Sequence, residues 1–184
     1  MKKLTALFIV FMVAFSLNTS AQIRVGGQVG LAVPMGNLGD VASMGFGFNG
    51  LFVYQLQPQI ELTGLIGYTT FGAKEEVEGF DYSLSTIPLL AGIRYSFSEE
   101  GVNPFRPYVG AELGLQFQSI TTEFNYFGFS GEESVSNTEF GFAPQVGMYY
   151  ALTPAIDLDA NLKLNIISDS NYLGINAGIL YRLP

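Results

Sequence analysis

The 184-residue chain has no cysteine, no histidine and no tryptophan. It has 8 lysines and arginines but 16 aspartates and glutamates. Without cysteine, the chain can form no disulfide, thiolate nucleophile, Cys-based metal site or lipidated cysteine. Without histidine, it lacks the side chain that most often serves as general base. The acidic balance argues against a nucleic-acid partner, which needs a basic face, and against a polybasic membrane-surface binder. We therefore expect no enzyme, no cofactor and no nucleic-acid partner.

The N-terminus has the three parts of a signal peptide. A positive start at Lys2 and Lys3 precedes the apolar run 6–15, and small residues lead to a cleavage site after Ala21. The run is shorter than the roughly 20 apolar residues of a membrane-spanning helix, which disfavours a retained anchor. We predict a cleaved signal peptide over residues 1–21 and one mature domain over 22–184. That domain keeps six basic and sixteen acidic residues, a formal charge of −10.

Long hydrophobic runs are absent after residue 21, although 48% of the chain is hydrophobic. The apolar residues alternate with polar ones instead, as in IDLDANLKLNI over 156–166. Alternation with a period of two is typical of strands, and segments of about ten alternating residues suit strands that cross a bilayer at a tilt. Eight such segments occur, at 23–33, 45–56, 60–71, 82–97, 105–117, 140–152, 156–166 and 173–183.

The connections alternate between short and long, which is the organisation of outer-membrane barrels. The short ones are 56–59, 98–104 and 152–154. The long, polar ones are 34–44, 72–81, 118–139 and 167–172. Pro88 and Pro144 lie inside the predicted strands: the phase change between Leu84 and Ile87 suggests a bulge near Pro88, whereas Pro144 has no explanation in the pattern.

The polar face of each segment carries glycines and charges, and the apolar face carries rings. An eight-strand barrel has an interior just wide enough for side chains, so small residues suit the inner face and phenylalanines the outer one. Tyrosines and phenylalanines cluster at both ends of the outer face, as in the aromatic girdles of outer-membrane barrels. The predicted interior network comprises Arg24, Glu61, Arg94, Arg106, Glu112, Asp157, Asp159, Lys163 and Arg182.

The segments IRVGGQVGLAVPMGNLGD and GINAGILYRL, near the two ends of the mature chain, resemble the small outer-membrane β-barrel proteins of Gram-negative bacteria, often labelled the porin family and akin to OmpA and OmpX. The resemblance implies an all-β, eight-stranded antiparallel up-and-down transmembrane barrel with both termini in the periplasm. It also implies no cofactor and no catalytic residue. We expect a monomer in the outer membrane, in contact with lipid and lipopolysaccharide.

Four functions compete at this point. The first is a structural or surface-binding barrel with no open pore, whose acidic loop (Glu75, Glu76, Glu78, Asp81) or aromatic loop could meet a surface protein or ligand. In the aromatic loop the candidate contact residues are Tyr126, Phe127 and Phe129. The alternative for these rings is that strands five and six extend past the membrane and pair them with each other.

The second function is a small-solute, porin-like channel, although aqueous channels appear at about 16–18 strands. The third is a membrane enzyme, for which Asp157 and Asp159 form a carboxylate pair that we interpret as interior ion pairs. The fourth is a soluble ligand carrier, which would extract without detergent. No acidic spacing, including the turn at 37–40, matches a full calcium loop, so we predict no metal site.

Overall fold

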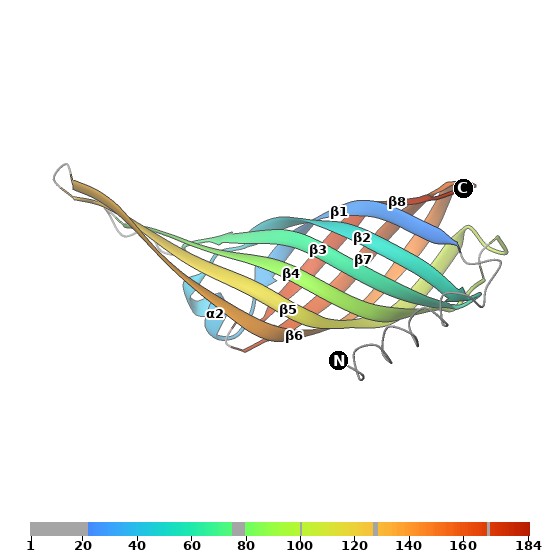
Figure 1. The fold of residues 1–184 in the computed structure, drawn as a ribbon, viewed down its shortest axis with the longest axis horizontal. Helices are drawn as coiled ribbons and strands as arrows, with labels where there is room; N and C mark the ends of the chain where they lie inside the picture. Colours follow the sequence, from blue (N-terminus) through green and yellow to red (C-terminus); the bar gives the residue numbers. More distant parts are fainter. Residues whose placement is uncertain (1–21, 75–79, 100, 127–128, 169) are drawn as a thin grey trace, which may run out of the picture.

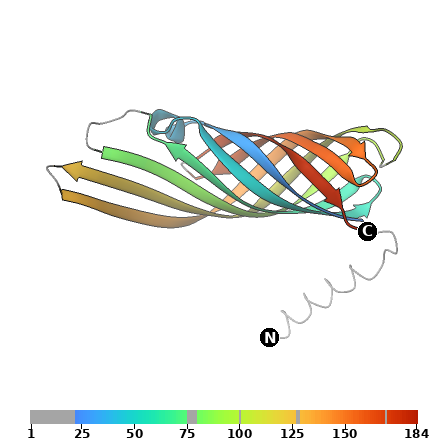
Figure 2. The same cartoon turned by 90° about the horizontal axis from the view of Figure 1, so that it is seen from above.

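The computed structural model describes residues 22–74, 80–99, 101–126, 129–168 and 170–184. Its eight strands follow one another around a closed barrel, each antiparallel to the next, and β8 pairs with β1 (Figures 1 and 2). The predicted fold class is confirmed. The strands are β1 (Ile23–Pro34), β2 (Gly45–Gln57), β3 (Ile60–Gly72), β4 (Phe80–Ser96), β5 (Phe105–Tyr126), β6 (Phe129–Thr153), β7 (Ile156–Ile167) and β8 (Tyr172–Arg182).

The predicted signal peptide, residues 1–21, lies outside the described residues, so it stays a prediction. Within the described part of the chain, no helix is long and apolar enough to cross a membrane.

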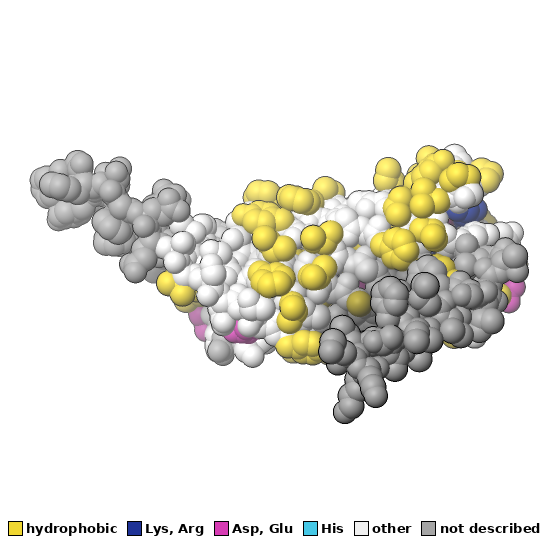
Figure 3. Space-filling view, in the orientation of Figure 1, with side chains coloured by type: hydrophobic (Ala, Val, Ile, Leu, Met, Phe, Trp, Pro, Cys, Tyr) yellow, Lys and Arg dark blue, Asp and Glu magenta, His cyan; other side chains and the backbone are white. Residues whose placement is uncertain are grey.

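Side chains alternate between the two faces of the barrel wall, because the period of a strand is two. In β7, Asp157, Asp159 and Lys163 are buried inside, while Leu158, Leu162 and Ile166 are 38–46% exposed outside. Hydrophobic side chains form two groups along the barrel axis, with a paler zone between them (Figure 3). The outer face is therefore apolar, as the alternation predicts. Tyr54, which the alternation in 45–56 puts among the outward-facing rings, is only 4% exposed, whereas Tyr95, Tyr150 and Tyr181 are 42–48% exposed.

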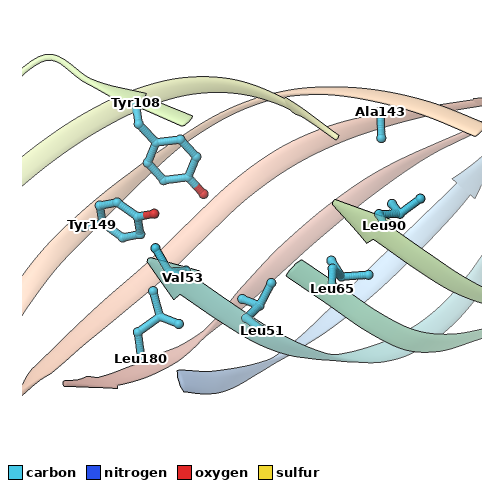
Figure 4. Close-up of a cluster of buried hydrophobic side chains, with 8 residues drawn as sticks. All are labelled: Leu51, Val53, Leu65, Leu90, Tyr108, Ala143, Tyr149 and Leu180. Carbon is cyan, nitrogen blue, oxygen red and sulfur yellow. The ribbon is translucent and has the colours of Figure 1, made fainter. Parts of the chain in front are cut away.

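Part of the interior is apolar, which the alternation does not predict. Leucines from β2, β3, β4 and β8 pack inside the wall with two tyrosines (Figure 4). This interior cluster packs beside the charged side chains of the lumen, because Tyr108 and Tyr149 belong to it and also bind charged groups. It consists of Leu51, Val53, Leu65, Leu90, Tyr108, Ala143, Tyr149 and Leu180.

A second apolar cluster closes the end of the barrel opposite the start of β1 and the end of β8. The connection 34–44 contains a short helix, α2 (Asn37–Val41), which alternation could not predict because the helix has only five residues. Its Leu38 is 4% exposed. We call this cluster the apolar plug; it comprises Ala32, Leu38, Ala42, Phe71, Leu84, Ile167 and Tyr172.

The expected bulge near Pro88 is wrong. The β3–β4 register is the same on both sides of the proline, with Ile66 opposite Leu89 and Thr69 opposite Thr86. Leu84 keeps the inward phase of its strand because it belongs to the apolar plug. The ladder instead loses its pairs at the proline itself, which has no N–H to donate.

Pro144 leaves a similar gap on its β7 side. The β6–β7 ladder resumes at Gln145 opposite Lys163 without a change of register. Each proline therefore interrupts hydrogen bonds with one neighbouring strand and keeps its pairing with β5. The register shifts occur elsewhere, next to two of the short turns, at Gln55/Gln57 and Ala151/Thr153.

Strands β4, β5 and β6 extend beyond the other strands, and β4 pairs with β5 up to Phe80 opposite Phe124. The connection predicted as a long loop over 118–139 is a hairpin, paired as far as Tyr126 opposite Phe129. Figure 1 shows it projecting from the end of the barrel that carries α2. The backbone therefore follows the alternative in which strands five and six continue past the membrane.

Candidate functional site

The lumen contains a continuous network of buried charges held by β1, β3, β4, β5 and β7. At the end near the termini, Arg24 binds Glu61 and also donates from Nη1 to Asp157 Oδ2 at 2.9 Å. Arg106 donates to the same Asp157 oxygen at 2.8 Å. All four side chains are at most 2% exposed. Asp157 thus joins two guanidinium groups from strands that are not neighbours in the barrel.

Two tyrosines connect this group to the middle of the lumen. The Tyr149 hydroxyl accepts from Arg94 at 2.8 Å and donates to Glu61 at 2.8 Å. Tyr108 donates to Asp159 at 2.7 Å, and Arg94 lies 3.2 Å from that carboxylate. The guanidinium carbons of Arg24, Arg94 and Arg106 also lie 4.7–5.1 Å from tyrosine ring centres, within the range of cation–π attraction.

Glu112 organises the third group, nearest the apolar plug. Its carboxylate accepts from Lys163 at 2.5 Å, Gln145 at 2.8 Å and Thr63 at 3.2 Å, and Arg94 lies 3.5 Å away. Glu112 has no exposed surface, and Lys163 is 4% exposed. A buried charge is tolerated when it is paired and its remaining hydrogen bonds are satisfied, which is the situation of Glu112.

The structure brings eight of the nine predicted network residues into this buried array. The ninth, Arg182, lies at the rim, where it donates to the Pro154 carbonyl and stands 4.0 Å from Asp157. Asp157 and Asp159 are bound by different cations, so they do not share a site as a catalytic carboxylate pair would. Sequence reasoning omitted the neutral members Gln28, Thr63, Tyr108, Gln145 and Tyr149; their place on the charged face of each strand was the available signal.

The loop candidates are less completely described. The backbones of Tyr126 and Phe129 end the hairpin, but their side chains and the whole of Phe127 lie outside the described residues. Of the predicted acidic loop, Glu75, Glu76 and Glu78 lie outside them as well, and Asp81 is described only as part of β4. Among the residues that the structure describes, no group of three or more acidic, histidine or cysteine side chains could hold a metal ion.

A wall that is apolar outside, a closed ladder without free edges in its main body, and an ionic interior together define a transmembrane β-barrel of the outer-membrane type. The chain belongs to the outer membrane protein beta-barrel domain family, whose model matches residues 4–182. It is therefore a protein of the cell outer membrane.

Three solved structures have the same fold. Neisserial surface protein A is 22% identical and has a TM-score of 0.58, covering 89% of this chain and 99% of that one. Ail, the attachment invasion locus protein of Yersinia pestis, solved with the heparin analogue sucrose octasulfate, is 20% identical at a TM-score of 0.57, with coverages of 89% and 97%. A major outer membrane protein of Thermus thermophilus is 13% identical at 0.68, with coverages of 89% and 100%.

A relative of similar length comes from Haemophilus influenzae. It is an uncharacterized protein, 26% identical over 186 residues, which cover 98% of this chain and 99% of that one.

Proposed function

We propose that this protein is a closed surface barrel that presents the β5–β6 hairpin as a binding platform. The observation that supports this most is the open edge of β6. Strand β7 ends at Ile167, opposite Gly141, whereas β6 begins at Phe129. Among the described residues, 129–140 pair with β5 alone. The other edge of the hairpin is covered, because β4 follows β5 up to Phe80 opposite Phe124.

An open strand edge has unpaired N–H and C=O groups that can accept another extended chain. Along this edge Val135 is 63% exposed, and the neighbouring Ser134, Ser136, Asn137 and Thr138 are exposed too. A partner can therefore approach the backbone without displacing bulky groups. The platform fits an extended, uncharged or basic polypeptide segment from another molecule at the cell surface.

The charge of the loops argues against a polyanionic ligand such as the heparin analogue bound to Ail. The chain carries Glu132 and Glu133 near the hairpin tip and three glutamates between 75 and 78. Like charges repel, so a sulfated sugar would meet an unfavourable potential. The rings Tyr126, Phe127 and Phe129 remain predicted anchors for an apolar group of the partner.

The alternative of a small-solute channel conflicts with the filled lumen. Arg94, Glu112, Asp159 and Tyr149 cross the interior and have no exposed surface, and the apolar plug closes one end. Eight strands leave space for side chains rather than for a water column. Planar-bilayer recordings of the purified protein test this directly: we expect no steady conductance, and a steady, large one would favour the channel.

A trimmed barrel tests the platform. Residues 119–136 are replaced by Asn-Gly, which joins the register partners Gln118 and Asn137 through the two-residue turn that favours hairpins. Binding of unstructured peptides to vesicles carrying the full-length or the trimmed barrel is then compared. Loss of binding in the trimmed barrel supports the proposal, and equal binding refutes it. Replacement of Tyr126, Phe127 and Phe129 by serine separates the ring anchors from the backbone edge.

A further inference from the structure

The end of the barrel that carries the C-terminus opens into a cup, which we call the turn-side cup. It is surrounded by the short turns that connect β2 to β3, β4 to β5 and β6 to β7 (Figure 1). Its volume is about 670 Å³, within the range of roughly 300–1,000 Å³ that is usual for small-molecule sites. Outer-membrane barrels have their short turns on the periplasmic side, so the turn-side cup opens into the periplasm, at the opposite end from the β5–β6 hairpin.

The floor of the turn-side cup contains a buried carboxylate with one unused oxygen. Asp157 lines the cup and is 2% exposed. Its Oδ2 accepts hydrogen bonds from Arg24 at 2.9 Å and from Arg106 at 2.8 Å, whereas its Oδ1 has no hydrogen-bond partner among the described residues. Buried polar atoms normally have a partner. A ligand in the cup can supply the missing one, which must be an N–H or O–H donor.

The charges around this floor leave one positive charge in excess. The guanidinium groups of Arg24, Arg106 and Arg182 surround only two carboxylates, those of Glu61 and Asp157. Arg182 is the most accessible of the three arginines, because 25% of its side chain is exposed. The excess charge favours a ligand that carries one negative charge near Arg182.

The wall and the rim of the turn-side cup suit a peptide. Each of the three turns contributes one proline to the wall: Pro58, Pro104 and Pro154. These apolar surfaces can contact small side chains. Gln57 and Asn103 are exposed at the rim, and their amides can pair with peptide N–H and C=O groups. Of the described residues that line the cup, none is aromatic, so a sugar ring would find no face on which to stack. Glu99 lies at the exposed rim, where solvent and salt screen its charge.

We propose that the turn-side cup binds the carboxyl-terminal end of a peptide in the periplasm. The terminal carboxylate lies against Arg182, and the N–H of the same terminal residue donates to Asp157 Oδ1. These two groups are attached to one Cα, and Arg182 Nη2 lies only 4.0 Å from Asp157 Oδ2, so one residue can reach both side chains. Arg182 donates from Nη1 to the Pro154 carbonyl, and a guanidinium has five N–H donors. It can therefore bind a carboxylate without leaving the wall.

The periplasm offers this chemistry from two sources. The stem peptides of the cell wall end partly in D-amino acids, whereas the carboxyl termini of proteins consist of L-amino acids. Both present a carboxylate next to a peptide N–H, so a comparison of the two enantiomers distinguishes the sources.

Acetylated dipeptides test each contact separately. Acetyl-Ala-Ala has both recognised groups, its C-terminal amide lacks the negative charge, and acetyl-Ala-Pro lacks the terminal N–H. Each peptide is titrated into the mature, full-length, nitrogen-15-labelled barrel in lipid nanodiscs. NMR then follows the side-chain signals of Asn103 and Arg182 in the cup and the backbone signal of Leu38 at the other end.

We expect acetyl-Ala-Ala to shift the Asn103 and Arg182 signals saturably and to leave Leu38 unchanged. The amidated and the proline-terminated peptides should each bind at least about tenfold more weakly, because each loses a hydrogen bond to a charged group. Binding of either enantiomer supports the proposal. Tighter binding of the D-peptide identifies the cell wall as the source, and tighter binding of the L-peptide identifies proteins.

Four results would overturn the proposal. Equal binding of the amidated peptide would exclude recognition of the carboxylate, and equal binding of the proline-terminated peptide would exclude the contact with Asp157. The absence of any saturable shift would show that water alone fills the cup. Tighter binding of glucose than of every peptide would show a sugar site instead.

A pair of variants tests the role of Arg182. Arg182→Gln removes the guanidinium from the cup, and the control Lys74→Gln removes one positive charge at the opposite end, where Lys74 donates to the Gly39 carbonyl. Heat-modifiable migration on a detergent gel confirms that each variant has folded. We expect acetyl-Ala-Ala to bind Arg182→Gln at least about tenfold more weakly and Lys74→Gln as tightly as the unsubstituted protein. Equal weakening in both variants would show a general attraction and refute the site. If Arg182→Gln does not fold, the peptide series on the unsubstituted protein decides.

Discussion

Replacement of Glu112 by glutamine removes the charge on which the third group of the lumen depends. The side chain has no exposed surface, and it receives hydrogen bonds from Lys163, Gln145 and Thr63. The variant leaves Lys163 buried and without its counter-ion, whereas Arg94 keeps Asp159. Breaking a buried ion pair by removing one partner costs about 3–5 kcal/mol. We expect the free energy of unfolding to fall by that amount.

The assay is urea unfolding of the protein in lipid vesicles, followed by far-UV circular dichroism and by heat-modifiable gel migration. Glu99→Gln, at an exposed turn position, is the matched control and should change stability by less than about 0.5 kcal/mol. The double variant Glu112→Gln/Lys163→Met removes both charges and should recover most of the loss, because a buried pair can be replaced by neutral groups at little cost. A loss below about 1 kcal/mol in the single variant, or no recovery in the double variant, would refute the account of the lumen.

Two further changes test the packing of the wall and of the plug. An alanine at Gly26 would place its Cβ against the Ile179 carbonyl, whereas an alanine at Gly27 meets only Asn49 O at 3.5 Å. We expect urea unfolding to show a loss of stability of about 1–3 kcal/mol for Gly26→Ala and of less than about 0.5 kcal/mol for Gly27→Ala. Equal losses for the two variants would contradict the crowded inner face. Leu38→Ala removes the α2 side chain from the apolar plug and should lower the free energy of unfolding by about 2–5 kcal/mol if the plug unfolds with the barrel. Val41→Ala, at an exposed position of the same helix, is the control. An unchanged midpoint of urea unfolding for Leu38→Ala would show that the plug opens independently.

The fold could be predicted because polar and apolar residues alternate in the membrane-spanning part of each strand. In a closed barrel every strand has both neighbours, so the only choice left is which face meets lipid. A one-residue slip would turn Lys163 outward, at roughly 2–4 kcal/mol near the midplane. The alternation in 156–166 thus predicts that Asp157, Asp159 and Lys163 point into the barrel, without knowledge of which strands pair.

The partners inside the lumen could not be predicted in the same way. Arg24 on β1 meets Asp157 on β7, with β8 between them and 133 residues along the chain, and such contacts depend on the diameter and stagger of the barrel rather than on local pattern. The alternation in 105–117 and 140–152 puts Tyr108 and Tyr149 on the charged face of their strands, but their bridging role requires the same geometry. The sequence therefore predicted which charged residues lie inside the barrel, whereas their pairing required the closed structure.

Two segments were misjudged, each for its own physical reason. Leu84 suggested a phase change because the inner face was taken to be polar throughout, but the apolar plug gives leucine a dry place inside the barrel. The connection 118–139 was taken for a loop because its residues are polar. Beyond the membrane both faces of a hairpin meet water, so alternation in hydrophobicity disappears while strand pairing continues.

The central claim, that the apolar side faces lipid and the ionic side fills the lumen, can be tested on unmodified protein in bilayers. NMR cross-relaxation between lipid acyl-chain protons and leucine methyl groups divides the leucines into two classes. We predict strong transfer to Leu62, Leu89, Leu158 and Leu162, which are 38–50% exposed, and none to Leu51, Leu65, Leu90 and Leu180, which are at most 4% exposed. Transfer to the second set, with none to the first, would show that the barrel is oriented the other way.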